Sequence, residues 1–124
     1  MHGLGDLESA VMDVLWREQH PLKVRHVLDL LDDERPRAYT TVLTVLDNLH
    51  RKAWVSRTRA GKAFLYEATL GRTEAAVRAL REVVDAAGDP EAVLLHFARL
   101  ATDHEADLLD SALSGRDAPD RRAR

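Results

Sequence analysis

The chain has 124 residues, no cysteine, 45% hydrophobic and 31% charged residues, and a formal net charge of −3 at pH 7. These values indicate one soluble domain, or one small domain with an appendage, and they exclude disulfides, thiolate metal sites and thiol catalysis. No apolar run approaches the roughly 18 residues of a membrane span. The first residues lack a signal-peptide pattern, so we expect a cytoplasmic protein without direct membrane association.

Charge is segregated along the chain. The window from Arg35 to Lys62 holds seven Lys or Arg residues against one acid, Asp47, and carries +6. Residues 1–34 carry −5 and residues 73–124 carry −4 by the same count. A cationic segment inside an acidic chain indicates a polyanionic partner, with DNA as the first candidate.

Two helices are expected before the cationic window. Asp6 is a candidate N-cap for the first helix, whose apolar residues recur at helical spacing as far as its end near Arg17. A second, short helix is expected over residues 24–31, with Lys23 at its cap position. Residues 32–37 are expected to form a polar loop.

A third helix with one apolar stripe is predicted from Tyr39 to Lys52. The periodicity then changes, and residues 54–59 and 64–68 indicate two strands joined by a short turn. Three helices followed by a hairpin form the winged-helix pattern, an elaborated helix-turn-helix. We therefore expect a mainly α fold with a small β-hairpin wing, in which residues 1–72 form a DNA-binding domain.

The helical pattern returns after the hairpin. Residues 73–115 are expected to form a helical dimerisation region that ends at Gly115, and residues 116–124 a disordered tail. The start signals of its three helices are Thr73, Asp89 followed by Pro90, and Thr102 with Glu105 as a capping box.

The outward face of the third helix carries hydroxyl, amide and guanidinium groups. It comprises Thr41, Thr44, Asn48 and Arg51, with Tyr39 and Thr40 at the N-terminal end. In helix-turn-helix proteins this end enters the major groove, where such groups bond base edges and phosphates. A solvated polar face on a core helix is the alternative. DNA binding is favoured because further basic residues follow that could hold phosphates, namely Lys52, Arg57, Arg59 and Lys62.

The helix that follows Pro90 is apolar around most of its circumference, so it must be buried on nearly all sides. A helical appendage of about 40 residues is too small to bury it alone. Mutual burial in a symmetric dimer would do so and suits a two-fold DNA site, whereas packing onto the winged helix in a monomer is the alternative. The expected interface residues are Val84, Leu94, Leu95, Phe97, Leu100, Leu109 and Leu113.

Neither a metal site nor catalysis is expected. Asp103, His104 and Glu105 are consecutive and point in different directions on a helix, while His96 lies eight residues before His104. A capping cluster is therefore favoured over a metal site. No Ser-His-Asp, paired-carboxylate or Gly-rich phosphate motif stands in a recognisable context, so we expect no cofactor and no enzymatic activity.

Several segments of the chain, in the order in which they occur, resemble the penicillinase repressor family of BlaI/MecI/CopY-type regulators. The resemblance covers about residues 4–113 and rests on the Trp-bearing segment Leu4–Trp16, the run Tyr39–Leu46, the segment Leu49–Lys52 and the wing. It implies a homodimeric transcriptional repressor that binds a palindromic operator. It also implies that the residues in contact with DNA include Thr40, Thr41, Thr44, Asn48 and Arg51.

In beta-lactam-responsive members of the family, a membrane metalloprotease sensor triggers cleavage before a Phe in the C-terminal region. The matching bond here is His96–Phe97, where several relatives have Asn–Phe. This resemblance implies release by proteolysis in response to an antibiotic or cell-wall signal. Copper-sensing members end in Cys-x-Cys pairs, which this chain lacks.

The chain departs from the family pattern after the third helix. Many members have Gly there, where this chain has Ala53. Alanine is less favourable than glycine in a left-handed cap, which predicts a different helix end.

Two other functions stay open from the residues alone. A winged-helix protein-interaction adaptor would show no salt-dependent binding to any DNA duplex. A small-ligand-responsive regulator would hold a pocket in its helical dimer core.

Overall fold

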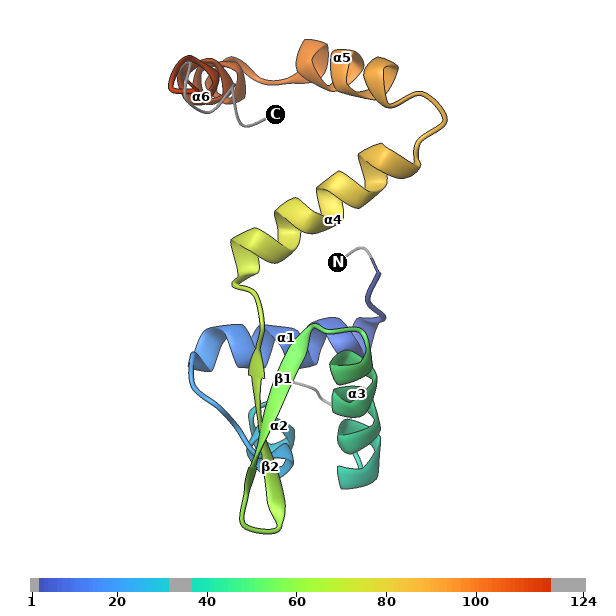
Figure 1. The fold of residues 1–124 in the computed structure, drawn as a ribbon, viewed down its shortest axis with the longest axis vertical. Helices are drawn as coiled ribbons and strands as arrows, with labels where there is room; N and C mark the ends of the chain where they lie inside the picture. The colour runs from blue at the N-terminus through green and yellow to red at the C-terminus, as the bar shows by residue number, and fades with distance from the viewer. Residues whose placement is uncertain (1–2, 32–36, 117–124) are drawn as a thin grey trace. The chain divides into compact units, whose positions relative to one another are not determined.

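The computed structural model describes residues 3–31 and 37–116, which contain six helices and a two-stranded antiparallel sheet (Figure 1). The contacts divide the chain into two compact units, residues 1–81 and 82–124. The elements in chain order are α1 (Asp6–Glu18), α2 (Val24–Leu30), α3 (Tyr39–Arg51), β1 (Val55–Ala60), β2 (Ala63–Ala68), α4 (Arg72–Ala86), α5 (Pro90–Leu100) and α6 (Asp103–Ser114).

The first unit is organised around one hydrophobic core, to which α1, α2, α3 and the hairpin all contribute. The stripe predicted on the third helix is buried, and Tyr66 of β2 is fully buried with it. Trp16 covers the edge of this core, and its indole N–H donates to the Leu70 carbonyl at 2.9 Å. The buried core residues are Val11, Met12, Val14, Leu15, Leu22, Val24, Val27, Val42, Val45, Leu46, Leu49, Val55 and Tyr66.

The hairpin of β1 and β2, called the wing below, is closed by a two-residue turn. Ala60 pairs with Ala63, which leaves Gly61 and Lys62 at the turn. Gly61 has a φ of 67°, and a glycine at the first position suits a type II′ hairpin turn. Leu22 and Tyr66 exchange two backbone hydrogen bonds of 2.8 Å, which fasten the wing to the α1–α2 connection.

The chain leaves α3 through a left-handed cap at Ala53, whose φ is 64°. The Trp54 N–H donates to the Leu49 carbonyl at 2.9 Å, and the Ala53 N–H donates to the His50 carbonyl at 3.0 Å. These are the two hydrogen bonds of a Schellman motif, which usually has glycine at this position. The prediction of a different helix end is therefore wrong, because alanine adopts the glycine conformation here.

Two predicted helix caps are also wrong. Gly5, not Asp6, is the N-cap of α1, because the Gly5 N–H donates to the Glu8 carboxylate at 2.9 Å. Asp6 instead lies in the first turn, where a negative charge suits the helix dipole. The helix α4 begins at Arg72, so Thr73 lies inside its first turn.

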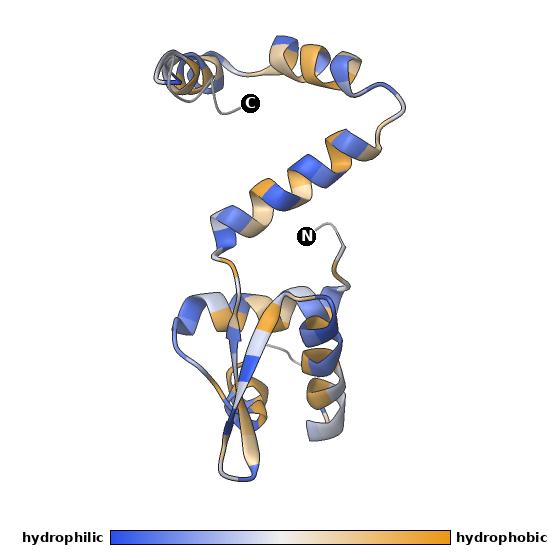
Figure 2. Cartoon of the chain, in the orientation of Figure 1, coloured by the Kyte–Doolittle hydropathy of each residue, from blue (hydrophilic) through white to orange (hydrophobic). Residues whose placement is uncertain are grey.

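In the second unit, the predicted starts of α5 and α6 are confirmed. The Asp89 carboxylate accepts a hydrogen bond from the Ala92 N–H at 3.1 Å, one residue before Pro90 opens α5. Thr102 and Glu105 form the predicted capping box, with hydrogen bonds of 2.8 and 3.1 Å. Neither helix buries any of its residues, although Figure 2 shows apolar residues along both.

Two predicted segments fall largely outside the described residues. They are the loop over residues 32–37 and the tail over residues 116–124, of which only Arg37 and Arg116 are described. No helix in the described ranges is long and apolar enough to cross a membrane.

Candidate nucleic-acid interface

The apolar stripe of α3 is buried, so the polar face of this helix is turned toward solvent. Thr40, Thr41, Thr44 and Arg51 are exposed, and Asn48 is half-buried. Ala38, the N-cap of α3, offers no side-chain hydrogen bond to the first turn. The positive end of the helix dipole, which no capping side chain neutralises, therefore favours an anion such as a phosphate.

Two local hydrogen bonds orient this polar face. The Thr44 hydroxyl donates to the Thr40 carbonyl at 2.9 Å, so its oxygen can still accept a hydrogen bond and its methyl can contact a base. The Arg51 guanidinium donates to the amide oxygen of Asn48, which leaves the amide N–H groups of Asn48 available. The face can thus accept, donate and make apolar contact at neighbouring positions.

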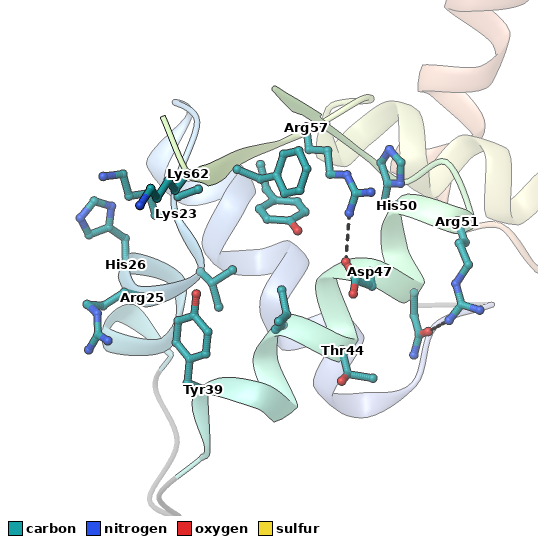
Figure 3. A pocket seen from close by; sticks show the side chains of 16 residues that line it. Lys23, Arg25, His26, Tyr39, Thr44, Asp47, His50, Arg51, Arg57 and Lys62 are labelled. Carbon is teal, nitrogen blue, oxygen red and sulfur yellow. Dashed lines mark hydrogen bonds and ion pairs between the residues drawn. The ribbon is translucent and has the colours of Figure 1, made fainter. Parts of the chain in front are cut away.

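A groove of about 980 Å³ lies between α2, α3 and the wing (Figure 3). Basic groups from all three elements line it, so a polyanion in the groove would meet positive charge on several sides. The polar lining residues are Lys23, Arg25 and His26 of α2 and its N-cap, Tyr39, Thr44, Asp47, Asn48, His50 and Arg51 of α3, and Arg57 and Lys62 of the wing.

The contribution of α2 was missed by the sequence analysis. Lys23, Arg25 and His26 precede the cationic window and lie in a segment with net negative charge, so the charge count hid them. The Arg25 guanidinium lies 5.7 Å from the ring centroid of Tyr39. This cation–π contact holds both side chains at the N-terminal end of α3. The run Lys-Val-Arg-His at the start of a helix was the available signal.

The basic residues of the wing occupy two kinds of environment. Arg59 and Lys62 are exposed near its tip, and the Nε of Arg59 donates to the Gly61 carbonyl at 3.3 Å. Arg57 is half-buried, with its Nη1 3.0 Å from Oδ1 of Asp47 and its guanidinium 4.4 Å from the ring centroid of Phe64. Arg57 is thus held against α3.

Lys52 is also held by partners within the first unit. Its Nζ lies 2.9 Å from the Glu8 carboxylate and 3.3 Å from the Gly3 carbonyl oxygen. Burial raises the pKa of Glu8, but hydrogen bonds from the Gly5 N–H and the Lys52 ammonium outweigh it and lower that pKa below its ordinary value. This ion pair fastens the start of α1 to the end of α3.

Most of the predicted interface residues are exposed in the single chain, with Leu100 the most exposed at 72%. Val84 differs, because it is buried within its own chain. The exposed apolar residues of α4 are instead Val77, Leu80 and Val83. The exposed members of the predicted set are Leu94, Leu95, Phe97, Leu100, Leu109 and Leu113.

Part of the cluster considered for metal binding caps a helix, since the Glu105 carboxylate accepts a hydrogen bond from the Thr102 N–H. Among the residues that the structure describes, no three His, Asp or Glu side chains are grouped to hold a metal ion.

Three core-forming helices, a wing and a groove lined with basic side chains define a DNA-binding winged-helix protein. The family model for the penicillinase repressor matches residues 4–114. The transcriptional regulator BlaI of Mycobacterium tuberculosis, in two strains, is 43% identical over 115 residues, which cover 90% of this chain and 83% of that protein. The chain therefore belongs to the penicillinase repressor family and is a transcriptional repressor of the BlaI type, which confirms the resemblance.

Two solved structures align with the chain. A probable transcriptional regulator from Pseudomonas aeruginosa aligns with a TM-score of 0.50 and 15% identity, over 94% of this chain and 80% of that one. The DNA-binding domain of the repressor BlaI aligns with a TM-score of 0.49 and 23% identity, over 58% of this chain and 87% of that one. The prediction of a mainly helical fold with a hairpin wing is confirmed.

Proposed function

We propose that the chain acts as a homodimer that binds a palindromic operator, with α3 in the major groove and the wing on the flanking backbone. The groove in Figure 3 supports this proposal, because the exposed Thr44 and the half-buried Asn48 line it together with basic side chains from three elements. Phosphate contacts would supply most of the affinity, and base contacts the sequence preference.

Base contact is assigned to the polar face of α3 from Tyr39 to Asn48. A threonine methyl can contact the methyl group of thymine, and an asparagine amide can pair with adenine in two hydrogen bonds. This role falls to Tyr39, Thr40, Thr41, Thr44 and Asn48, whose side chains are exposed or half-buried.

Phosphate contact is assigned to the exposed cations around this face. Arg51 ends the helix face, Arg59 and Lys62 lie on the wing, and Lys23 and Arg25 line the groove from α2. Each phosphate that a cation neutralises releases counterions, so binding should weaken steeply with salt.

Dimerisation is assigned to residues 73–115, with residues 1–72 as the DNA-binding domain. The helices α5 and α6 bury no residue of their own, yet six large apolar side chains of the predicted interface are exposed on them. A second copy of the same helices would cover these exposed apolar side chains.

Release of the operator is assigned to cleavage at His96–Phe97 by a membrane metalloprotease sensor that responds to an antibiotic or cell-wall signal. Both residues are exposed in the middle of α5. A cut at this bond would separate Leu94 and Leu95 from the interface residues that follow. The dimer would then lose its contacts, and with them its hold on a two-fold site.

The proposal is tested by selecting operator duplexes from the DNA upstream of the gene and measuring affinity at several salt concentrations. Arg59→Ala should weaken binding to every duplex and flatten the salt dependence, whereas Thr44→Ala should change the preferred base at one position. Unchanged affinity and preference in both variants would refute the assigned interface. A protein-interaction adaptor would show no salt-dependent binding.

A further inference from the structure

Asp47 is the only acidic residue among the described residues that line the groove. It lies on α3 between Thr44 and Arg51, one turn from each, and so belongs to the face assigned to DNA. An unpaired carboxylate there would be repelled by the phosphates of any bound duplex. DNA binding on this face therefore requires a positive group that neutralises the Asp47 carboxylate.

Arg57 of the wing supplies the compensating charge. Its Nη1 lies 3.0 Å from Oδ1 of Asp47, and Figure 3 shows the contact crossing from β1 to α3. The same guanidinium lies over the ring of Phe64, and its side chain is only 29% exposed. Arg57 is thus held by a carboxylate as well as by a ring. The guanidinium of Arg59 also lies 5.6 Å from the Phe64 ring centroid, but Arg59 and Lys62 are exposed.

The environment of Arg57 argues against a phosphate contact. Its Nη1 is directed at the Asp47 carboxylate and its guanidinium lies over the Phe64 ring, so only its remaining N–H groups could bond a phosphate. The adjacent carboxylate also neutralises its charge, so such a contact would release fewer counterions than a contact from an unpaired cation. With the pair intact, the site is neutral and joins the wing to the helix.

We propose that Asp47 and Arg57 are positioning residues for operator recognition. Their ion pair fixes the wing relative to α3 and withholds one cation from the DNA backbone, so that discrimination between sequences rises while non-specific affinity falls. This inference rests on the proposed function, because it assumes that α3 and the wing contact one duplex together.

The pair can be tested with Asp47→Asn, Arg57→Gln and the double variant, which replaces a neutral ion pair with a neutral amide pair. Affinity is measured from low to moderate salt on two probes. One is the tightest duplex that the wild-type protein selects from a random-sequence pool, and the other is a scrambled duplex of equal length and composition. Thermal unfolding confirms that each variant is folded.

Asp47→Asn should free Arg57 to contact one further phosphate in each protomer. The slope of log K against log salt should then steepen by about 1.8 for a dimer, with tighter binding to the scrambled duplex. The double variant should keep the wild-type slope, because no phosphate contact is gained or lost. It should also lose about threefold to tenfold of the operator preference, since the wing is no longer fixed.

Other outcomes would overturn the inference. A double variant whose slope is flatter by about 1.8 would make Arg57 a phosphate contact in the wild-type protein. An effect of Asp47→Asn that persists unchanged in the Arg57→Gln background would show that Asp47 acts on DNA without Arg57. An unchanged operator preference in the double variant would remove the positioning role.

The proposed function and this inference fail differently. If the wild-type protein binds neither duplex in a salt-dependent way, the proposed function is wrong. If the wild-type protein binds as proposed and only the variant pattern differs, the positioning pair alone is wrong.

Discussion

Replacing Ala53 with glycine should stabilise the winged helix. Ala53 has a φ of 64° and already makes both hydrogen bonds of the Schellman motif, so glycine needs no rearrangement to fit. A left-handed conformation costs a residue with a Cβ about 1–2 kcal/mol. The greater freedom of glycine in the unfolded chain costs about 0.4–1 kcal/mol. Because Ala53 is exposed, its methyl adds little burial, and the net stabilisation should be about 0.5–1 kcal/mol.

The assay is denaturant and thermal unfolding of the full chain, followed by the fluorescence of Trp16 and Trp54. The expected gain corresponds to a rise in Tm of about 2–6 °C for a unit of this size. Ala10→Gly in α1 is the matched control and should lower stability by about 1 kcal/mol, because its backbone is helical. If Ala53→Gly destabilised the protein as Ala10→Gly does, the left-handed cap would be refuted.

Three further predictions concern affinity, pH and assembly. Arg59→Ala should flatten the salt slope of a dimer by about 1.8, while Thr44→Ala should leave the slope unchanged and alter base preference, as measured by fluorescence anisotropy on operator variants. Glu8→Gln should destabilise the protein by about 1 kcal/mol at neutral pH. Because the folded-state pKa of Glu8 is lowered, this difference is full above its unfolded pKa and should vanish as the pH falls through the folded value, which unfolding curves across acidic pH would show. Leu100→Glu should weaken dimerisation by at least about a hundredfold in sedimentation, and Arg99→Glu, its polar neighbour, should not.

The architecture of the first unit could be predicted because its signals are local and agree with one another. The stripe of α3, the change to strand periodicity after Lys52 and the glycine of the turn each specify one element. The capping signals at Asp89 and Thr102 were equally local, and both helices begin where those residues predict. Where a glycine stands beside a polar residue that could also be the N-cap, as Gly5 does beside Asp6, the predicted N-cap is wrong by one residue.

The partners of the charged residues could not be predicted in this way. Arg57 and Asp47 are ten residues apart, and Lys52 and Glu8 are 44 apart, so each pair forms only when the fold brings two elements together. The sequence shows these residues as parts of a charge count, in which Arg57 and Lys62 look alike. Tertiary structure separates a cation held by an acid from a cation open to a phosphate. The same limit hid Lys23 and Arg25, which join the groove only because α2 packs beside α3.

The central claim is that this winged helix binds duplex DNA as a dimer through exposed cations, and the salt dependence of operator binding tests it most directly. Four or five such cations in each protomer predict a slope of log K against log salt between about −7 and −9. A slope of this size for the wild-type protein, reduced stepwise when Arg59 and Lys62 are replaced, is the expected result. Binding that does not change with salt, or no binding to any duplex from the selected pool, would contradict the claim.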